Sequence, residues 1–416
     1  MEIKRDSYLE QLKLREWNGM IKIITGLRRS GKSYLLFKIF LKYLRKKGIP
    51  KDHIIEVVLD DIKNEHLRDK HALFEHISTS IKDNNPYYVL LDEIQLVDGF
   101  SDVLNSLLHI DNVDAYVTGS NSKFLSKDIL TEFRGRGDEV RVYPLSFSEF
   151  VPYYEGSQTR AFSEYMTYGG LPALLPMQTD TQKANYLQNL FEETYLKDII
   201  DKNGIRRDTE LDNLVDILAS SVGSLTNPSK LSKTFKTVLQ SKITDKTIKT
   251  FIDYLLDAFI IDEAKRYDVK GRKYIGSPFK YYYTDIGLRN ARLGFRQMEE
   301  THLMENIIYN ELKYRGYSVD VGIVKVREYS GKEFDDKQLE LDFVAYKGNN
   351  KYYIQSAFAI PNGEKKYQEE RPLTDINYSF KKIVVFGDDI KPKRDESGLL
   401  TMGIYDFLLN NNSLDL

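Results

Sequence analysis

The first 150 positions alternate between apolar runs and amphipathic stretches. Strands are predicted at residues 20–25, 54–61, 87–93 and 114–120, and the run at 87–93 is nearly all apolar, as in a buried parallel strand. Between these runs, apolar residues recur at helical spacing, as in SYLLFKIFLKYLRKK from residue 33. Strands that alternate with helices predict a parallel, three-layer α/β domain, which ends near residues 144–150.

The pattern changes after residue 150. Residues 151–222 are helical in pattern, and two further helices are expected at 225–238 and 244–261. A strand–turn–strand follows at 261–285, and helix, turn, helix and β-hairpin together are typical of a winged helix. From about residue 300, a helix and alternating β patterns predict another α/β unit.

These patterns divide the chain into four parts. We expect a parallel α/β domain at residues 1–150, a helical lid or linker at 151–222, a winged helix at 223–298 and a C-terminal α/β domain at 299–416. A chain of 416 residues is too long for one ordinary domain, which agrees with this division.

Composition narrows the possible functions. The net charge is −2, so no overall basic field attracts nucleic acid, and any such surface must be local. The absence of cysteine excludes disulfides, thiolate zinc sites and cysteine nucleophiles. No stretch approaches the roughly 20 apolar residues that a membrane span requires, and the charged N-terminus lacks the apolar core of a signal peptide. We therefore expect a cytoplasmic protein.

The stretch GLRRSGKS matches the phosphate-binding pattern G-x-x-x-x-G-K-[ST]. It follows a predicted buried strand and precedes a predicted helix, which is the context that the pattern requires. Glycines let backbone N–H groups turn toward phosphate oxygens, the lysine supplies a point charge, and the serine hydroxyl is a Mg²⁺ ligand. The predicted ATP-binding residues are Gly26, Leu27, Arg28, Arg29, Ser30, Gly31, Lys32, Ser33 and Tyr34. A chance match in a surface turn is the alternative.

The strand YYVLLDE supplies the acids that such a loop needs. We expect Asp92 to hold Mg²⁺ together with Ser33, and Glu93 to activate the attacking water. Two acids at a strand end are otherwise commonplace and usually only solvated. A glutamate directly after the aspartate favours hydrolysis over nucleotide binding alone.

Two further groups of residues could complete the site. Ser120 or Asn121, after the fourth strand, could orient the water, or could only cap the following helix. Arg134 or Arg136, in FRGRGDE, could reach the γ-phosphate held by a neighbouring subunit, or could form a solvated basic turn.

The ordered motifs GLRRSGKS, VLLDE, TGSNSKFLS, FRGR, YPLSFSEF and YGGLPALL resemble a family of prokaryotic AAA+ ATPases on the archaeal-ATPase and STAND side of that class. The resemblance covers nearly the whole chain. It implies an ATPase domain, a winged helix and a C-terminal domain related to the PD-(D/E)XK nucleases. Association with DNA or genome maintenance is a further implication.

The C-terminal domain keeps only part of a nuclease site. Such a site needs one acid on a strand, then a second acid and a lysine two residues apart on the next strand. Asp342 supplies the first acid and Glu305 is a possible ligand, but Gln355 and Ala357 stand where the second acid and the lysine belong. We expect a degenerate nuclease-like domain that serves binding or assembly. Asp342 as a simple strand cap is the alternative.

Positive charge is concentrated in the predicted winged helix. Residues 224–280 contain 12 Lys and Arg against 6 Asp and Glu, a net charge of +6. The candidate DNA contacts, mostly to the backbone, are Lys246, Lys249, Lys270, Arg272 and Lys273. A packing module with ordinary surface lysines is the alternative.

Together these features predict a Mg²⁺-dependent ATPase coupled to DNA binding or remodelling, with branched or recombining DNA as one substrate. An arginine supplied by a neighbour implies a homo-oligomer, for example a hexamer. The alternatives are a nucleotide-dependent switch that binds a protein partner in defence or signalling and, less favoured, an ATP-driven nuclease.

Overall fold

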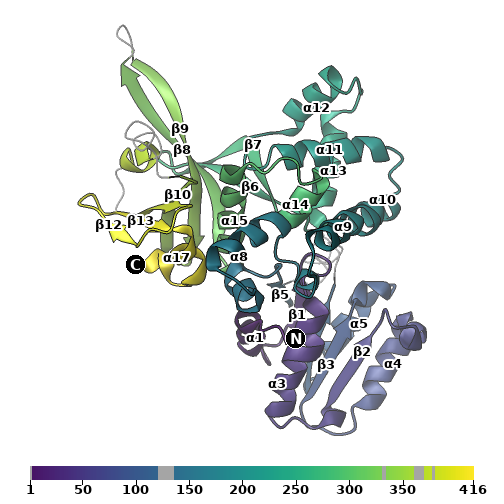
Figure 1. The fold of residues 1–416 in the computed structure, drawn as a ribbon. Coiled ribbons are helices and arrows are strands. Elements are labelled where there is room, and N and C mark those ends of the chain that lie inside the picture. The colour runs from purple at the N-terminus through teal and green to yellow at the C-terminus, as the bar shows by residue number, and fades with distance from the viewer. Residues whose placement is uncertain (1, 120–134, 330–333, 360–369, 377–379) are drawn as a thin grey trace. The chain divides into compact units, whose positions relative to one another are not determined.

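The computed structural model describes residues 2–119, 135–329, 334–359, 370–376 and 380–416 (Figure 1). The chain forms two compact units. Unit 1 contains residues 1–144 with 257–259, and unit 2 contains residues 145–256 with 260–416.

Unit 1 is built on a five-stranded, fully parallel sheet with the order β2-β3-β4-β1-β5. Its strands are β1 (Ile21–Thr25), β2 (Ile54–Val58), β3 (Tyr87–Asp92), β4 (Val113–Thr118) and β5 (Gly137–Arg141). Its helices are α1 (Asp6–Lys13), α2 (Lys32–Tyr34), α3 (Leu41–Lys46), α4 (Lys70–Ser80) and α5 (Phe100–Leu107). A π-helical stretch, Leu35–Phe40, joins α2 to α3, so that residues 32–46 are helical throughout. The α/β class and the four predicted strands are confirmed.

Strand β5 is absent from the sequence prediction. Its sequence, GDEVR, has one fully buried side chain, so it carries no apolar run. The strand forms because β1 offers an open edge, along which residues 21–25 pair with 137–141. Backbone pairing in the sheet, rather than local sequence, therefore decides this element.

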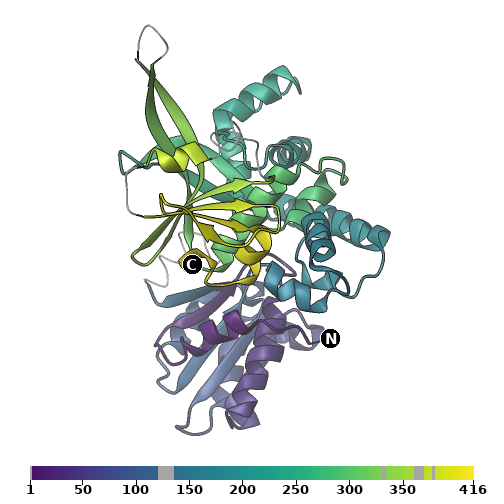
Figure 2. The same ribbon diagram turned by 60° about the vertical axis from the view of Figure 1, so that its left-hand side comes forward.

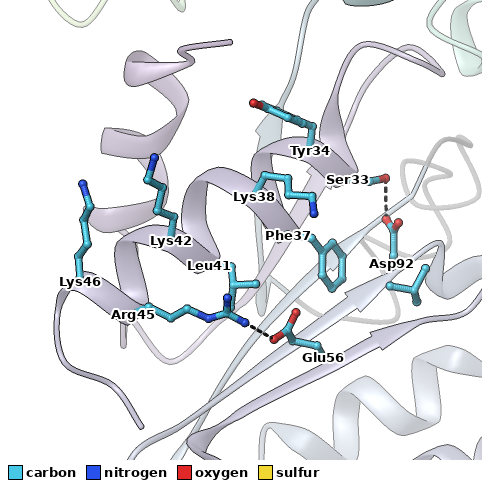
Figure 3. A pocket seen from close by; sticks show the side chains of 11 residues that line it. Ser33, Tyr34, Phe37, Lys38, Leu41, Lys42, Arg45, Lys46, Glu56 and Asp92 are labelled. Carbon is cyan, nitrogen blue, oxygen red and sulfur yellow. Dashed lines mark hydrogen bonds and ion pairs between the residues drawn. The ribbon is translucent and has the colours of Figure 1, made fainter. Parts of the chain in front are cut away.

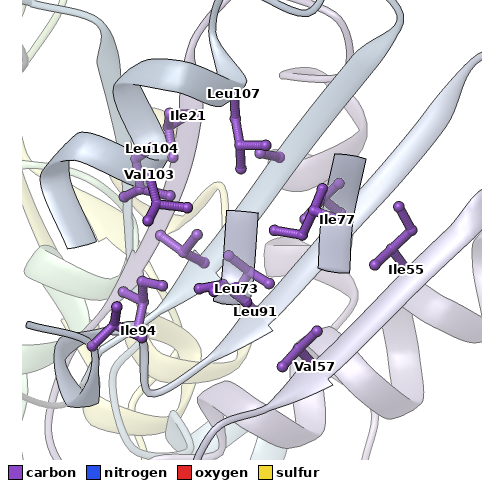
Figure 4. Close-up of a cluster of buried hydrophobic side chains, with 14 of the residues drawn as sticks. Ile21, Ile55, Val57, Leu73, Ile77, Leu91, Ile94, Val103, Leu104 and Leu107 are labelled. Carbon is purple, nitrogen blue, oxygen red and sulfur yellow. The ribbon is translucent and has the colours of Figure 1, made fainter. Parts of the chain in front are cut away.

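One hydrophobic core of unit 1 lies between the sheet and helices α4 and α5 (Figure 4). Leu73 and Ile77 of α4 and Leu104 of α5 pack against sheet residues such as Val57 and Leu91. Burying each such side chain contributes about 1.5–3 kcal/mol. In β2, Ile55 and Val57 face this core, so the alternation of a strand turns Glu56 to the opposite face.

Unit 2 begins with a series of helices, and its strands then alternate with further helices. Its helices are α7 (Phe147–Phe150), α8 (Gln158–Tyr168), α9 (Asp180–Leu190), α10 (Lys197–Asn203), α11 (Asp208–Ser220), α12 (Pro228–Thr237), α13 (Asp245–Asp257), α14 (Ile286–Arg292), α15 (Glu300–Tyr314) and α17 (Ile404–Leu409). Its strands are β6 (Ile261–Asp268), β7 (Lys273–Tyr283), β8 (Ser318–Tyr329), β9 (Phe334–Lys347), β10 (Asn350–Ala357), β11 (Lys381–Phe386), β12 (Lys393–Arg394) and β13 (Leu399–Gly403).

All eight of these strands belong to one sheet, with the order β12-β13-β11-β10-β9-β8-β6-β7. The long β8–β9 hairpin extends past the other strands (Figures 1 and 2). The hairpin expected as the wing, β6–β7, joins this sheet because β6 pairs in parallel with β8 over residues 266–268. The expected boundary between residues 298 and 299 therefore divides a continuous sheet.

The glycines of YGGLPALL have a packing role within unit 2. The backbone N–H of Gly170 donates to Asp285 Oδ2 at 2.8 Å, and a Cβ on Gly169 would lie 2.3 Å from Asp285 Oδ1. Asp285 in turn caps α14 by accepting from Leu288 N at 3.1 Å. Burial raises the pKa of Asp285 to about 6.

Candidate functional site

The loop between β1 and the helix of residues 32–46 has the conformation of a phosphate cradle. Gly26, Arg29 and Gly31 have positive φ angles of 128°, 64° and 98°. Such left-handed residues turn successive N–H groups toward one side of a loop, which creates a concave anion site. At Gly26 the need for glycine is strict, because a Cβ there would lie 2.1 Å from the carbonyl oxygen of Val142.

Lys32 lies inside this loop and is almost fully buried, with 4% of its surface exposed. Its ammonium group donates to the carbonyl oxygens of Gly26 at 3.1 Å and Leu27 at 3.0 Å. Burial lowers the pKa of Lys32 to about 8, although Glu93 and Asp92 act in the opposite direction. The ammonium is thus poorly compensated and is suited to an anionic ligand.

Three side chains and one backbone N–H group meet at the C-terminal edge of the sheet. Ser33 Oγ donates to Asp92 Oδ1 at 3.0 Å, and the hydroxyl of Thr118 donates to the same oxygen. The backbone N–H of Glu93 donates to Thr118 Oγ1 at 3.0 Å. Thr118 therefore links Asp92, the last residue of β3, to the backbone of Glu93, which follows it.

Asp92 and Glu93 differ in setting. Asp92 is buried, and burial raises the pKa of its carboxyl group despite the bonds from Thr118 and Ser33. Glu93 has a left-handed backbone with φ of 50°, and its carboxylate accepts from the side chain of Gln95. A strained non-glycine residue at this point holds the Glu93 side chain in a defined direction.

The residues at this edge fit Mg²⁺ and a nucleotide phosphate chain. A hydroxyl and a carboxylate oxygen, here Ser33 and Asp92, are the hard oxygen ligands that Mg²⁺ prefers. The buried ammonium of Lys32 and the left-handed loop supply the positive side of a phosphate site.

A groove of about 1010 Å³ starts at Ser33 and Asp92 and follows the helix of residues 32–46 (Figure 3). Phe37 and Leu41 line its middle, and Arg45 closes its far end with an ion pair to Glu56 at 3.3 Å. The groove adjoins the proposed Mg²⁺ ligands rather than the loop of residues 26–32.

The other expected ATP-site residues are placed as follows. Leu27 and Ser30 are buried, whereas Arg28 and Arg29 are exposed. The hydroxyl of Tyr34 accepts from the backbone N–H of Ile3 at 3.2 Å. Arg136 is exposed just before β5. Ser120, Asn121 and Arg134 lie outside the residues that the structure describes.

Thr118 is the site residue that sequence reasoning missed. It is the last residue of β4, and its neighbours in the sheet are β3 and β1, which carry the acids and the loop. The usable signal was its position at the end of a buried strand, the place where active-site residues gather in parallel sheets.

In unit 2 the structure brings the three nuclease-like residues together. Asp342 N donates to Gln355 Oε1 at 3.3 Å. Glu305 and Asp342 share a lysine neighbour, Lys280 of β7, at 2.8 Å and 3.8 Å. Sequence reasoning missed Lys280, whose only signal was a lysine among aromatic residues in FKYYY. No group of three or more acids or histidines suited to a metal ion occurs among the described residues.

The five candidate DNA contacts are all exposed. Lys246 and Lys249 lie on α13, and Lys270, Arg272 and Lys273 lie at the turn between β6 and β7. The opposite, apolar side of α13 is buried at Ile248, Phe251, Ile252 and Leu255.

Within the described ranges, no helix has both the length and the apolar character to cross a membrane.

Comparison with known proteins agrees with this site. A sequence model of the AAA domain matches residues 18–151, and a domain of unknown function (DUF8612) matches residues 159–299. An uncharacterized protein of Haemophilus influenzae is 34% identical over 98% of both chains. An uncharacterized protein of Methanocaldococcus jannaschii is 27% identical over 89% of this chain and 82% of its own. The chain belongs to the same family as the Haemophilus protein, and its residues 18–151 match the AAA domain.

Two solved structures are similar only in part. The Aeropyrum pernix ORC1 protein in complex with DNA aligns with 70% of this chain and 92% of its own, at 12% identity and a TM-score of 0.28. PCH-2 of C. elegans aligns with 62% of this chain and 69% of its own, at 14% identity and a TM-score of 0.26. At these TM-scores, neither likeness contributes to the functional argument.

Proposed function

We propose that this protein is a Mg²⁺-dependent ATPase that hydrolyses ATP to ADP and phosphate and couples hydrolysis to DNA binding or remodelling. The observation that carries the proposal is the network of Ser33, Asp92, Thr118 and Glu93 beside the buried ammonium of Lys32. A loop that only binds nucleotide would need neither Glu93 nor the hydrogen bond that joins the backbone of Glu93 to the hydroxyl of Thr118.

Each residue has a distinct role in this proposal. The loop of residues 26–33 holds the phosphate chain, and Lys32 contacts the β- and γ-phosphates. Ser33 and Asp92 hold Mg²⁺, which when bound neutralises phosphate charge. Glu93 orients the attacking water and accepts its proton. Thr118 fixes the positions of the Asp92 carboxyl group and the Glu93 backbone relative to each other through its two hydrogen bonds.

An arginine from a neighbouring copy completes the site in this proposal. Arg136 is exposed just before β5, which lies on the far side of β1 from β3 in the strand order. An arginine placed there is available to a second copy, and such a residue accelerates phosphoryl transfer by about 10³–10⁵-fold. We therefore expect a ring or another homo-oligomer, with Arg134 as the other candidate for this role.

The DNA contacts are assigned to the exposed lysines and arginine of α13 and the β6–β7 turn. Residues 224–280 carry a net charge of +6 in a chain of net −2, so the positive charge is local. Exposed Lys and Arg at a hairpin turn suit the phosphate backbone rather than base edges. Branched or recombining DNA is the proposed substrate.

The ATPase test compares the wild type with Lys32→Ala, without DNA and with single strands, duplex or a four-way junction. We expect Lys32→Ala to lose at least about 10²-fold in turnover, because the site loses its central positive charge. Lys63→Ala, which changes an exposed lysine of the same unit, is the matched control and should keep wild-type turnover. Equal turnover in Lys32→Ala and Lys63→Ala would exclude this ATP site.

The DNA test compares two double charge reversals. Lys270→Glu with Lys273→Glu should weaken DNA binding and reduce the salt dependence by about two units of slope, because each lysine neutralises one phosphate. Lys391→Glu with Lys393→Glu, at the β12 end of the same sheet, should change neither. If ATP turnover is real but insensitive to every DNA, a nucleotide-dependent switch with a protein partner becomes the better assignment.

A further inference from the structure

Unit 2 contains a buried cluster of charged side chains that the proposed ATPase does not use. Lys280 of β7 is 2% exposed and donates to Glu305 Oε1 of α15 at 2.8 Å. The same ammonium lies 2.7 Å from Glu340 Oε1 and 3.8 Å from Asp342 Oδ1, both on β9. One cation thus faces three carboxyl groups from two other elements.

Further polar groups contact the carboxyl groups of this cluster. Tyr282 donates its hydroxyl to Glu305 Oε1 at 2.6 Å, and the backbone N–H of Ser356 donates to Asp342 Oδ2 at 2.8 Å. His302 Nδ1 lies 3.9 Å from the second oxygen of Glu305.

The charge state follows from these contacts. Burial opposes ionisation of Lys280, but Glu305, Asp342 and Glu340 outweigh it and raise the pKa of the ammonium. Burial also opposes ionisation of Glu305, but Lys280 and neighbouring hydrogen bonds keep its pKa below the usual value. Burial and the charge of Glu305 raise the pKa of Asp342 well above its usual range. The core of the cluster is therefore a buried Lys280–Glu305 ion pair, with the carboxyl groups of Glu340 and Asp342 beside it.

This arrangement does not fit the metal site of the nucleases that the sequence resembles. Gln355 is an amide where a second acid is needed, and it accepts from the backbone N–H of Asp342. A divalent cation would need the carboxyl oxygens that already face the ammonium of Lys280, at 2.8 Å for Glu305, 2.7 Å for Glu340 and 3.8 Å for Asp342. Lys280 also differs from a catalytic lysine, because it comes from β7 rather than from the strand after Asp342 and bonds directly to the acids.

We propose that Lys280 replaces the divalent cation of a nuclease-like site, so that this centre is metal-free and holds β7, α15 and β9 together. This proposal is independent of the ATPase and DNA assignments, since it concerns only contacts within unit 2.

The test uses Mn²⁺ as the probe on the full chain without nucleotide, in an Asp92→Asn background that removes the proposed Mg²⁺ ligand of unit 1. In this background we expect no Mn²⁺ binding by calorimetry and no Mn²⁺-dependent rise in Tm. Adding Lys280→Met should lower Tm by about 10 °C, because it leaves buried acids without a counter-ion, and Mn²⁺ should then restore part of the loss. Lys273→Met, which changes an exposed lysine on the same strand, is the control. It should neither lower Tm nor make Tm respond to Mn²⁺.

Three outcomes would overturn the proposal: Mn²⁺ binding in the Asp92→Asn background, Mn²⁺-dependent DNA cleavage that Asp342→Ala abolishes, or equal Tm values for Lys280→Met and Lys273→Met. If Lys280→Met does not fold, the double change Lys280→Met with Glu305→Gln removes both charges of the pair. That variant should fold without Mn²⁺ and should not respond to it, and failure to fold would count against the ion-pair role.

Discussion

Lys32 donates to two carbonyl oxygens of its own loop, at 3.0 Å and 3.1 Å. These neutral acceptors do not compensate its charge, which is why burial lowers its pKa to about 8. A phosphate chain would supply the missing negative charge, so nucleotide binding and protonation of Lys32 are linked.

This linkage predicts a pH dependence. Below pH 8 the ammonium of the free protein is charged, and above it the free protein loses a proton that ATP binding must restore. Nucleotide affinity should therefore fall as pH rises, by roughly tenfold between pH 7 and pH 9. Titrations of Mg²⁺–ATP binding by calorimetry would measure this. Lys32→Arg keeps its charge over the whole range and should show no such fall; a flat profile in the wild type would contradict the assignment.

Thr118 allows a second prediction at this scale. Thr118→Val keeps the side-chain shape but removes the hydrogen bonds to Asp92 and to Glu93 N. We expect Mg²⁺-dependent turnover to fall by about 10–100-fold, because both acids lose their alignment, with little change in ATP affinity without Mg²⁺. Steady-state rates would measure the loss of turnover, and an unchanged Tm would show that the loss comes from misaligned acids rather than from unfolding. Thr118→Ser should retain activity, and equal rates for the Val and Ser variants would remove Thr118 from the site.

How far the site was predictable depends on where each residue comes from. Lys32, Ser33, Asp92 and Glu93 follow from spacing, because a strand, a loop and a helix fix their geometry locally. Thr118 depends on which strands lie side by side, and Lys280 on a contact between β7 and residues 25 or more positions away. A linear pattern carries neither kind of information.

At the scale of elements, the same distinction holds. Four parallel strands of unit 1 were predicted because each is an apolar run, whereas β5 depends on pairing with β1. In unit 2, α13 and the β6–β7 hairpin were predicted from periodicity, but the pairing of β6 with β8 was not, because about 50 residues separate them. The lid, the winged helix and the nuclease relationship of the last domain stay predictions.

The turn from β1 into the loop gives a prediction for this scale. Gly26→Ala places a Cβ 2.1 Å from Val142 O, so the loop or β5 must shift. We expect a loss of at least about 2 kcal/mol in unfolding free energy, from the clash and the left-handed backbone together. Gly48→Ala is a control that shares a positive φ, of 89°, but has no atom within 4 Å. Chemical denaturation of both variants would measure their unfolding free energies. Equal losses in the two variants would mean that the clash with Val142 O adds nothing to the backbone strain.

At the scale of the whole molecule, the proposed site is shared between copies. Arg136→Ala and Lys32→Ala should each be inactive, the first for lack of an arginine and the second for lack of a lysine. Because one interface takes its lysine and its arginine from different copies, mixing the two inactive proteins should restore activity, up to about a quarter of wild type for random pairing. Arg134→Ala should be mixed in parallel. Turnover assays that show no recovery with either arginine variant would exclude a shared site.

The pairing of β6 with β8 has a practical consequence for dissecting this protein. A fragment that begins at residue 299, where the sequence pattern suggests a new domain, would retain β8 and β9 but lose the strand that covers the free edge of β8. Exposed strand edges promote self-association, so such a fragment is prone to precipitate for reasons unrelated to its biology. A fragment that begins near residue 145 keeps all eight strands and is the sounder choice for expression.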